Sequence, residues 1–251
     1  MPATGPDTHA AQAAATYSRQ GIHLSRAATI PWEDRINVDN WPSQAGMYHD
    51  DRDNAFTLRL INYPFGSTEA RHVHAGCHAT TVLRGKAVVD GLTLGPLDVI
   101  LGPSNEPHGP LHYPEGCKLL SAFQGSYYHS EVERLSGAPQ YRLIQSAGFE
   151  WHDDAARGCR VKTLVDHGLG RLLVEVGEFR AGLSLSLPVP RPAQALLVIE
   201  GSVTLNGGSV MPPPTPQPPF GEWDFIYLDD HGEDALLRFT QATTLLMLTL
   251  R

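Results

Sequence analysis

Apolar residues in this chain gather in short runs that alternate with polar residues or are interrupted by turn residues. A run of this kind is typical of a strand, because successive side chains of a strand point to opposite faces. No helical period of comparable length competes with these runs. The pattern predicts an all-β protein whose main strands lie within residues 56–63, 79–91, 98–103, 117–123, 171–179, 195–208, 224–230 and 243–250.

Two segments depart from this pattern. Residues 1–20 are Ala-rich and hold few large apolar side chains, which indicates a frayed helix or a flexible segment. Residues 131–156 show weak helical character and clustered charge, which is typical of a domain boundary. We therefore expect a flexible segment at 1–20, a first domain at 21–135 and a second domain at 136–251.

The two expected domains share an internal repeat. Residues 72–91 align without a gap with residues 188–207, and five positions are identical, including Gly85 and Gly201. Further on, the hexapeptide LDVILG resembles WDFIYL, at an offset that a ten-residue Pro-rich insertion accounts for. A shared order of strand, Gly turn and strand predicts a duplicated β domain.

Composition narrows the class of protein. Gly and Pro supply 44 of 251 residues (24 and 20), or 17.5%, above the average of about 12%. This favours many tight turns over a helical bundle. The net charge is −8, with only three Lys beside 16 Arg, so no basic stripe is available to follow a phosphate backbone. Nucleic acid is therefore excluded as a partner.

The sequence shows no pattern typical of a membrane span, a signal peptide or paired cysteines. No apolar run approaches the roughly 18 residues of a membrane span, and the N-terminal residues do not resemble a signal peptide. We expect a cytoplasmic protein with no membrane partner. The three cysteines show no paired spacing, so neither a disulfide framework nor a thiolate zinc site is indicated.

The histidines are clustered and are therefore candidates for a functional site, since five of the twelve lie between positions 72 and 112. His72 and His74 project from one face of a strand, because residues two apart share a face. His78 returns to that face after a small turn, and His108 comes from a later segment. An isolated HxH pair is often a chance pair on a solvated strand, but four histidines in this order indicate a metal site.

These residues resemble the motifs of the cupin superfamily. Its first motif has two His separated by one residue, an acidic ligand four positions later and a Gly seven further on; here those places hold His72, His74, His78 and Gly85. Its second motif resembles GPLDVILGPSNEPH, which ends at His108. A loop one residue longer than usual leaves His112 as an alternative to His108. We favour His108, because only one of the two would face inward.

The resemblance covers residues 71–125 and implies a fold. It implies two cupin-type β-barrels in tandem, each a jelly-roll-like double-stranded β-helix. The second barrel is expected to be degenerate and without metal, because the first three ligand positions are occupied there by Pro188, Pro190 and Gln194.

The ligand set has consequences for the metal. His78 stands where most cupins have an acid, which resembles the four-histidine cupins. Four neutral imidazoles leave the charge of the cation uncancelled and so strengthen its Lewis acidity. Imidazole ligation suits Fe, Zn, Cu and Ni, and the resemblance adds Mn. We expect one divalent transition metal, with iron(II) favoured.

Other candidate residues have weaker patterns. Glu106 is the candidate catalytic residue, as a general base or as an acceptor for a ligand N–H; the alternative is a solvated loop carboxylate. Cys77 is expected to face away from the ligands. Aromatic residues late in the first domain belong to the core or the mouth of the barrel: Phe123, Tyr127 and Tyr128. The remaining histidines that show no partner spacing are expected at the surface: His129, His152, His167 and His231.

The resemblance implies an enzyme that acts on a small molecule. The leading hypothesis is a dioxygenase that cleaves an enolisable diketone or a phenolic substrate with O₂. The first alternative is an O₂-independent cyclase, isomerase or lyase, in which the metal polarises a carbonyl. The second alternative is a non-enzymatic metal or ligand sensor. The second barrel would support the first or supply part of a homodimer interface.

Overall fold

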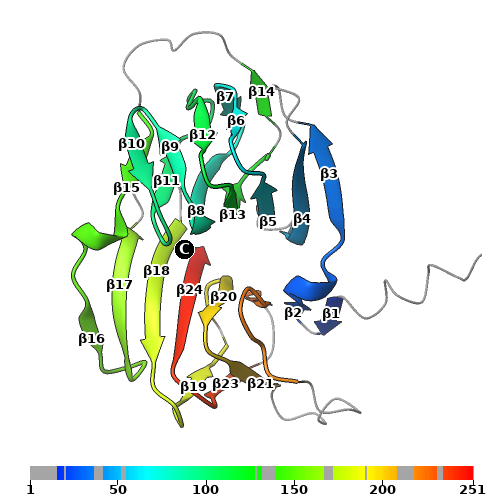
Figure 1. Ribbon diagram of the computed structural model, residues 1–251. Helices are drawn as coiled ribbons and strands as arrows, with labels where there is room; N and C mark the ends of the chain where they lie inside the picture. The colour runs from blue at the N-terminus through cyan, green and yellow to red at the C-terminus, as the bar shows by residue number, and fades with distance from the viewer. Residues whose placement is uncertain are drawn as a thin grey trace, which may run out of the picture.

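The chain folds into two β-rich lobes, one above the other (Figure 1). The computed structural model describes residues 16–19, 21–36, 42–51, 55–127, 129–131, 140–166, 172–189, 191–207, 218–230 and 234–250. Two 3-10 turns interrupt the strands, η1 (Ala27–Thr29) and η2 (Ser146–Gly148). Among the described residues, no helix has the length and apolar character needed to cross a bilayer.

The first lobe is built on a seven-stranded sheet. Its strands are β3 (Trp32–Ile36), β4 (Pro42–Asp51), β5 (Phe56–Tyr63), β8 (Cys77–Gly85), β11 (Val99–Gly102), β13 (Cys117–Gln124) and β15 (Arg142–Ile144). They are arranged in the order β15-β11-β8-β13-β5-β4-β3. Shorter strands make two smaller sheets in this lobe: β6 (Ser67–Glu69), β9 (Ala87–Val89), β10 (Leu92–Leu94) and β12 (Leu111–Tyr113), and the pair β7 (His72–His74) and β14 (His129–Glu131).

The second lobe repeats this plan. Its large sheet contains β1 (Thr16–Arg19), β2 (Ile22–Ser25), β16 (His152–Asp154), β17 (Cys159–Asp166), β18 (Leu172–Phe179), β20 (Gln194–Glu200), β22 (Phe225–Leu228) and β24 (Thr243–Leu250). The order is β1-β2-β22-β20-β24-β18-β17-β16. A smaller sheet contains β19 (Ser184–Leu187), β21 (Val203–Gly207) and β23 (Ala235–Phe239).

The strand orders confirm the duplication. From β11 to β3 the first sheet matches the second sheet from β22 to β16, strand for strand. Gly85 and Gly201 both have positive φ, at 80° and 90°. A Cβ at either position would meet a backbone carbonyl oxygen, 2.1 Å away at Gly116 and 2.3 Å away at Ala242. Only glycine fits there, because it has no Cβ.

The eight expected strand regions all contain strands. The weak helical character expected within 131–156 is wrong for the residues described, because β15 and β16 are strands and η2 is a single turn. Charged residues are tolerated in β16 because it is an edge strand, and His152 and Asp153 are exposed. Most of the segment 1–20 lies outside the described residues, but Thr16–Arg19 pairs with β2 as a strand.

Edge strands are exchanged between the two lobes. β2 precedes the first sheet in the chain, yet it pairs with β22 in the second sheet. In return, β15 follows the first sheet and pairs with β11 at its edge. The expected boundary near residue 135 stays a prediction, but each sheet contains a strand from the other side of that position.

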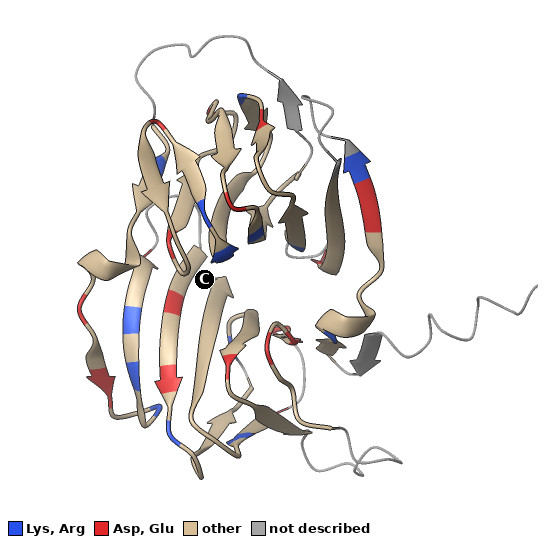
Figure 2. Cartoon of the chain, viewed as in Figure 1, with Lys and Arg blue, Asp and Glu red and all other residues tan. Residues whose placement is uncertain are grey.

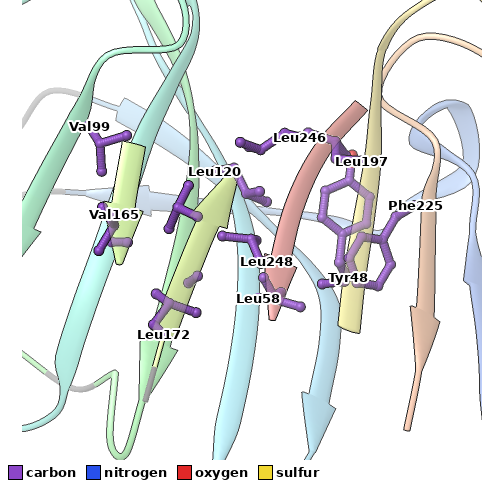
Figure 3. Close-up of a cluster of buried hydrophobic side chains, with 14 of the residues drawn as sticks. Tyr48, Leu58, Val99, Leu120, Val165, Leu172, Leu197, Phe225, Leu246 and Leu248 are labelled. Carbon is purple, nitrogen blue, oxygen red and sulfur yellow. The ribbon is translucent and has the colours of Figure 1, made fainter. Parts of the chain in front are cut away.

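The large sheets pack face to face and share one hydrophobic core. Side chains from both lobes interdigitate there (Figure 3), and Tyr48 stacks on Phe225 with ring centroids 5.0 Å apart. Leu58, Val174 and Leu246 have no exposed surface. Fully burying a side chain of this size stabilises a fold by roughly 1.5–3 kcal/mol, so the shared core joins the lobes strongly.

The two barrel interiors differ. Phe179, Phe220 and Phe239 fill the interior of the second lobe, together with aliphatic side chains. A smaller cluster fills part of the first interior, and it includes Val82, Ile100 and Tyr113. The rest of the first interior is open and holds the histidines.

Candidate metal centre

Backbone pairing brings the HxH strand and the later histidine together. The His72 N–H donates to the carbonyl of His108 at 3.0 Å, and the His108 N–H donates to that of His72 at 2.9 Å. The Asn105 N–H also donates to the His74 carbonyl at 2.7 Å. This bridge explains how residues 36 positions apart in the sequence place their side chains in one site.

Each of the three imidazoles is held by a backbone carbonyl. The Nδ1 atoms of His72, His74 and His108 lie 2.9, 3.3 and 3.3 Å from the carbonyl oxygens of Ala70, Tyr127 and Glu106. A carbonyl only accepts, so Nδ1 carries the proton and Nε2 carries the lone pair in each ring. Metal-ligating histidines are oriented in this way.

Ring nitrogens of the three imidazoles lie close together. The Nε2 atoms of His72 and His74 are 3.1 Å apart, and ring nitrogens of His72, His74 and His108 all lie within 4.8 Å of one another. Two ligands at right angles on a metal, each at about 2.1 Å, would be separated by about 3 Å. Two lone pairs facing each other at this distance repel unless a cation lies between them. The three imidazoles therefore fit a metal ion, which they can hold.

His78 lies beside this group. Its ring centroid is 4.7 Å from that of His108 and 4.9 Å from that of His74. Its Nδ1 is 3.1 Å from Thr80 Oγ1, and its buried Nε2 has no hydrogen-bond partner and packs against Gly102. Burial, followed by the nearby His108 and His72, holds the pKa of His78 well below its usual value. The neutral ring is thus suited to be a fourth ligand, although its nitrogens are not in the three-imidazole group.

A cavity of about 260 Å³ opens onto these rings. Glu69 lines it and lies 3.9 Å from His72 Nε2. The hydroxyls of Tyr63 and Tyr113 donate to the Glu69 carboxylate at 2.7 and 2.9 Å. Burial, reinforced by Glu69, raises the pKa of both tyrosines well above the usual value. Both hydroxyls therefore stay protonated and keep the carboxylate in place.

The remaining walls are partly apolar and partly basic. Phe123 packs edge-on against His74, with ring centroids 4.9 Å apart. Aliphatic side chains continue the apolar wall, and Arg35 and Arg59 also line the cavity. The apolar lining comprises Ala45, Ile61, Ile100, Leu111, Leu119 and Phe123.

Several other predicted residues lie away from the cavity. The Glu106 carboxylate accepts the Gln140 N–H at 2.9 Å and does not line the cavity; its carbonyl is the group that holds His108. His112 is exposed, with Nδ1 3.2 Å from Thr68 Oγ1. Cys77 Sγ lies 3.3 Å from Ser104 Oγ, also away from the cavity.

The other aromatic and histidine candidates divide between described and undescribed residues. Tyr127 lies near Arg59 and Phe123, whereas Tyr128 is outside the described residues. His152 is exposed, as expected. His167 and His231, and the side chain of His129, lie outside the described residues.

The equivalent part of the second barrel is closed. Gln194, at the position that corresponds to His78, lines a pocket of only about 20 Å³. The Arg157 guanidinium lies against this pocket and donates to both Glu175 carboxylate oxygens, at 2.8 and 3.2 Å. Among the described residues, the histidine group of the first barrel is the one cluster arranged for a metal.

Sequence reasoning missed Glu69 and Arg59. Arg59 gave a signal, since it interrupts the apolar run FTLRLINY. Glu69 gave none, because it lies on a separate short strand three residues before His72. Strand register decides which side chains face the cavity, and register could not be derived from the pattern alone.

Comparison with known proteins identifies the fold. No protein-family model and no curated protein matches the sequence. Among solved structures, a Nostoc punctiforme protein provisionally described as a dioxygenase has a TM-score of 0.75 at 11% identity, covering 94% of this chain and 84% of that one. Bacillus subtilis oxalate decarboxylase has a TM-score of 0.63 at 12% identity, covering 94% of this chain and 78% of that one.

A third similar structure is protein Ylba of E. coli, of the family DUF861. It has a TM-score of 0.68 at 10% identity and covers 98% of this chain and 97% of that one. At such low identities the similarity establishes the fold. The duplicated sheets and the histidine motifs agree with it, and the chain has the two-barrel fold of the cupin superfamily.

Proposed function

We propose that this protein is a metal-dependent cupin enzyme, and that it is a dioxygenase that cleaves an enolisable diketone or a phenolic small molecule with O₂. The observation that carries the proposal is the group of three imidazoles whose ring nitrogens lie close together beside a cavity. The similarity to the Nostoc punctiforme protein supports this reaction class.

The chain's own residues would prepare the substrate. A bound divalent metal would supply Lewis acidity and a binding position for substrate oxygen. His72, His74 and His108 would hold it through Nε2, because their Nδ1 atoms are engaged by carbonyls. Glu69 is the carboxylate that faces the cavity, so its oxygens are placed to accept the proton that an enol or phenol releases.

The apolar lining would exclude water from the reacting groups. Phe123 and the aliphatic wall leave a space of about 260 Å³, slightly below the roughly 300–1,000 Å³ common for ligand pockets. The substrate is therefore expected to be compact.

Oxygen consumption tests the proposal. Protein loaded with iron(II) is mixed with a panel of 1,3-diketones, flavonols and dihydroxyacetophenones, and O₂ uptake and substrate loss are recorded together. We expect stoichiometric uptake with at least one substrate and none with the His74→Ala variant. Loaded protein that is inert across the panel would contradict the dioxygenase assignment.

An O₂-independent cyclase, isomerase or lyase is the second candidate. The observation that favours it is the all-imidazole donor group, which leaves the charge of a cation uncancelled and suits carbonyl polarisation. Activity that is unchanged under anaerobic conditions, in protein that contains zinc as isolated, would select this candidate.

A further inference from the structure

Arg59 places a cation in the cavity of the first barrel. It lies in the middle of β5, between Leu58 and Leu60, which have no exposed surface and point into the shared core. Because alternate side chains of a strand point to opposite faces, Arg59 points into the barrel instead. Only 7% of its surface is exposed, and it lines the cavity together with the histidines.

Among the described residues, no carboxylate forms an ion pair with this guanidinium, although the charge of Glu33 acts on it. The guanidinium lies over the Tyr127 ring, whose centroid is 4.9 Å from the Arg59 Cζ. Burial, followed by the charge of Arg35, lowers the pKa of Arg59. Burial therefore disfavours the charged form of this side chain. A buried charge normally has a partner, because leaving it unpaired costs several kcal/mol.

In the second barrel, the residue at the position that corresponds to Arg59 is also charged, and a neighbouring side chain neutralises it. Arg59 pairs with Ser121 across β5 and β13, and Glu175 pairs with Met247 across β18 and β24, the corresponding strands. Glu175 is therefore the counterpart of Arg59. It forms an ion pair with Arg157 at 2.8 Å, and the pocket there shrinks to about 20 Å³. The first barrel leaves the corresponding space open.

We propose that the open space beside Arg59 is an anion subsite, and that the substrate of this cavity is a small organic carboxylate whose carboxylate group Arg59 binds. A guanidinium offers two parallel N–H donors that match the two oxygens of a carboxylate. Arg35, on the edge strand β3 that carries charges of both signs (Figure 2), also lines the cavity, but its guanidinium is ion-paired with Glu33 at 3.0 Å, which leaves Arg59 as the cation available to a ligand. This inference rests on the proposed function, since it names the substrate class of the same cavity.

Binding of uncharged and charged probes of the same shape tests the subsite. Benzoate and benzamide, butyrate and butyramide, and pyruvate and pyruvamide are titrated by calorimetry into the full-length protein as purified. The titrations are repeated after chelator treatment, because a carboxylate can also bind a metal. We expect at least one carboxylate to bind ten-fold or more tightly than its amide in both preparations.

Variants assign the effect to Arg59. We expect Arg59→Gln to weaken carboxylate binding ten-fold or more while leaving amide binding unchanged, and Arg59→Lys to restore part of it. Arg84→Gln, which removes an exposed Arg from β8, is the matched control and should change neither. Circular dichroism and thermal unfolding establish that each variant is folded.

The outcomes separate this inference from the proposed function. Equal binding of acid and amide in the wild-type protein, or failure of every carboxylate to bind, would overturn the subsite without reference to any variant. Full carboxylate affinity in folded Arg59→Gln would overturn it too. Charge-dependent binding in protein that never consumes O₂ would keep the subsite and reject the dioxygenase.

Discussion

At the scale of single residues, the orientation of the imidazoles depends on main-chain groups. Three carbonyl oxygens accept from Nδ1, so the direction of every Nε2 lone pair is set by backbone that other parts of the sheet hold in place. The rings are therefore arranged before a metal arrives, and binding need not order them.

Replacing His74 with Ala is expected to remove nearly all bound metal, because it deletes one of three converging nitrogens. Elemental analysis of purified protein checks this, and His152→Ala, at an exposed position on β16, should keep the wild-type content. Equal metal content in the His74→Ala and His152→Ala variants would refute the site.

The metal content of the wild-type protein should also fall below about pH 6.5, where free imidazole is protonated.

Replacing His78 with Asn is expected to weaken metal binding less than replacing His74. The nitrogens of His78 contact Thr80 and Gly102, so it adds to the group without completing it. Competition with a chromophoric chelator measures both dissociation constants. If the two variants lose the same affinity, His78 is a full ligand.

How far the site could be predicted depends on what kind of signal each residue leaves. The histidines could be found because two of them share a strand and the motif spacing is distinctive. Glu69 and Arg59 could not be assigned, because their place depends on which strands close the barrel and in which register. For Glu106, the group that lies against His108 is the main-chain carbonyl, which the sequence pattern does not distinguish from the carboxylate.

At the scale of elements, the same glycine turn follows equivalent strands in the two lobes. Gly85 is the last residue of β8, Gly201 directly follows the equivalent strand β20, and both approach equivalent carbonyls, which explains why both are present in the repeat. Two of the longer strands that the pattern missed, β4 and β17, contain polar residues and register shifts, at Met47/His49 and Thr163/Val165. A bulge breaks the two-residue alternation on which strand prediction relies.

Gly85→Ala is expected to lower the free energy of unfolding by about 3 kcal/mol, because the new Cβ would meet the Gly116 carbonyl and φ is positive. Gly95→Ala is the matched control, since nothing lies within 4 Å of the added Cβ. Urea unfolding followed by circular dichroism gives both values. Similar values for the two variants would contradict the tight turn.

At the scale of the whole molecule, the lobes meet through aromatic as well as aliphatic side chains. The centroid of the His49 ring lies 4.0 Å from that of Tyr227 and 4.5 Å from that of His23. The buried Nε2 of His49 has no hydrogen-bond partner among the described residues. Burial, followed by His23, lowers the pKa of His49 to about 4, although Asp51 and Asp50 act in the opposite direction.

This buried imidazole predicts a loss of stability in mild acid. In the unfolded chain, His49 takes up a proton near pH 6.5, whereas in the folded protein it does so only near pH 4. The free energy of unfolding should therefore fall as the pH is lowered from 6.5 towards 4, by about 2 kcal/mol between pH 7.5 and 5.0.

Urea titrations of chelator-treated protein measure this change without interference from metal loss. His49→Phe keeps a ring against Tyr227 and removes the titrating group, so its stability should vary less over the same range. An unchanged pH dependence in this variant would assign the effect to other groups.

The exchange of β2 and β15 has a consequence for dividing the chain. Each half gives an edge strand to the other, so a cut between the halves would leave β22 and β11 with unpaired edges, which promote aggregation. Either half on its own would therefore expose a strand edge that the other half now covers. The second barrel, whose described residues form no histidine cluster, thus completes the sheet of the first by supplying β15.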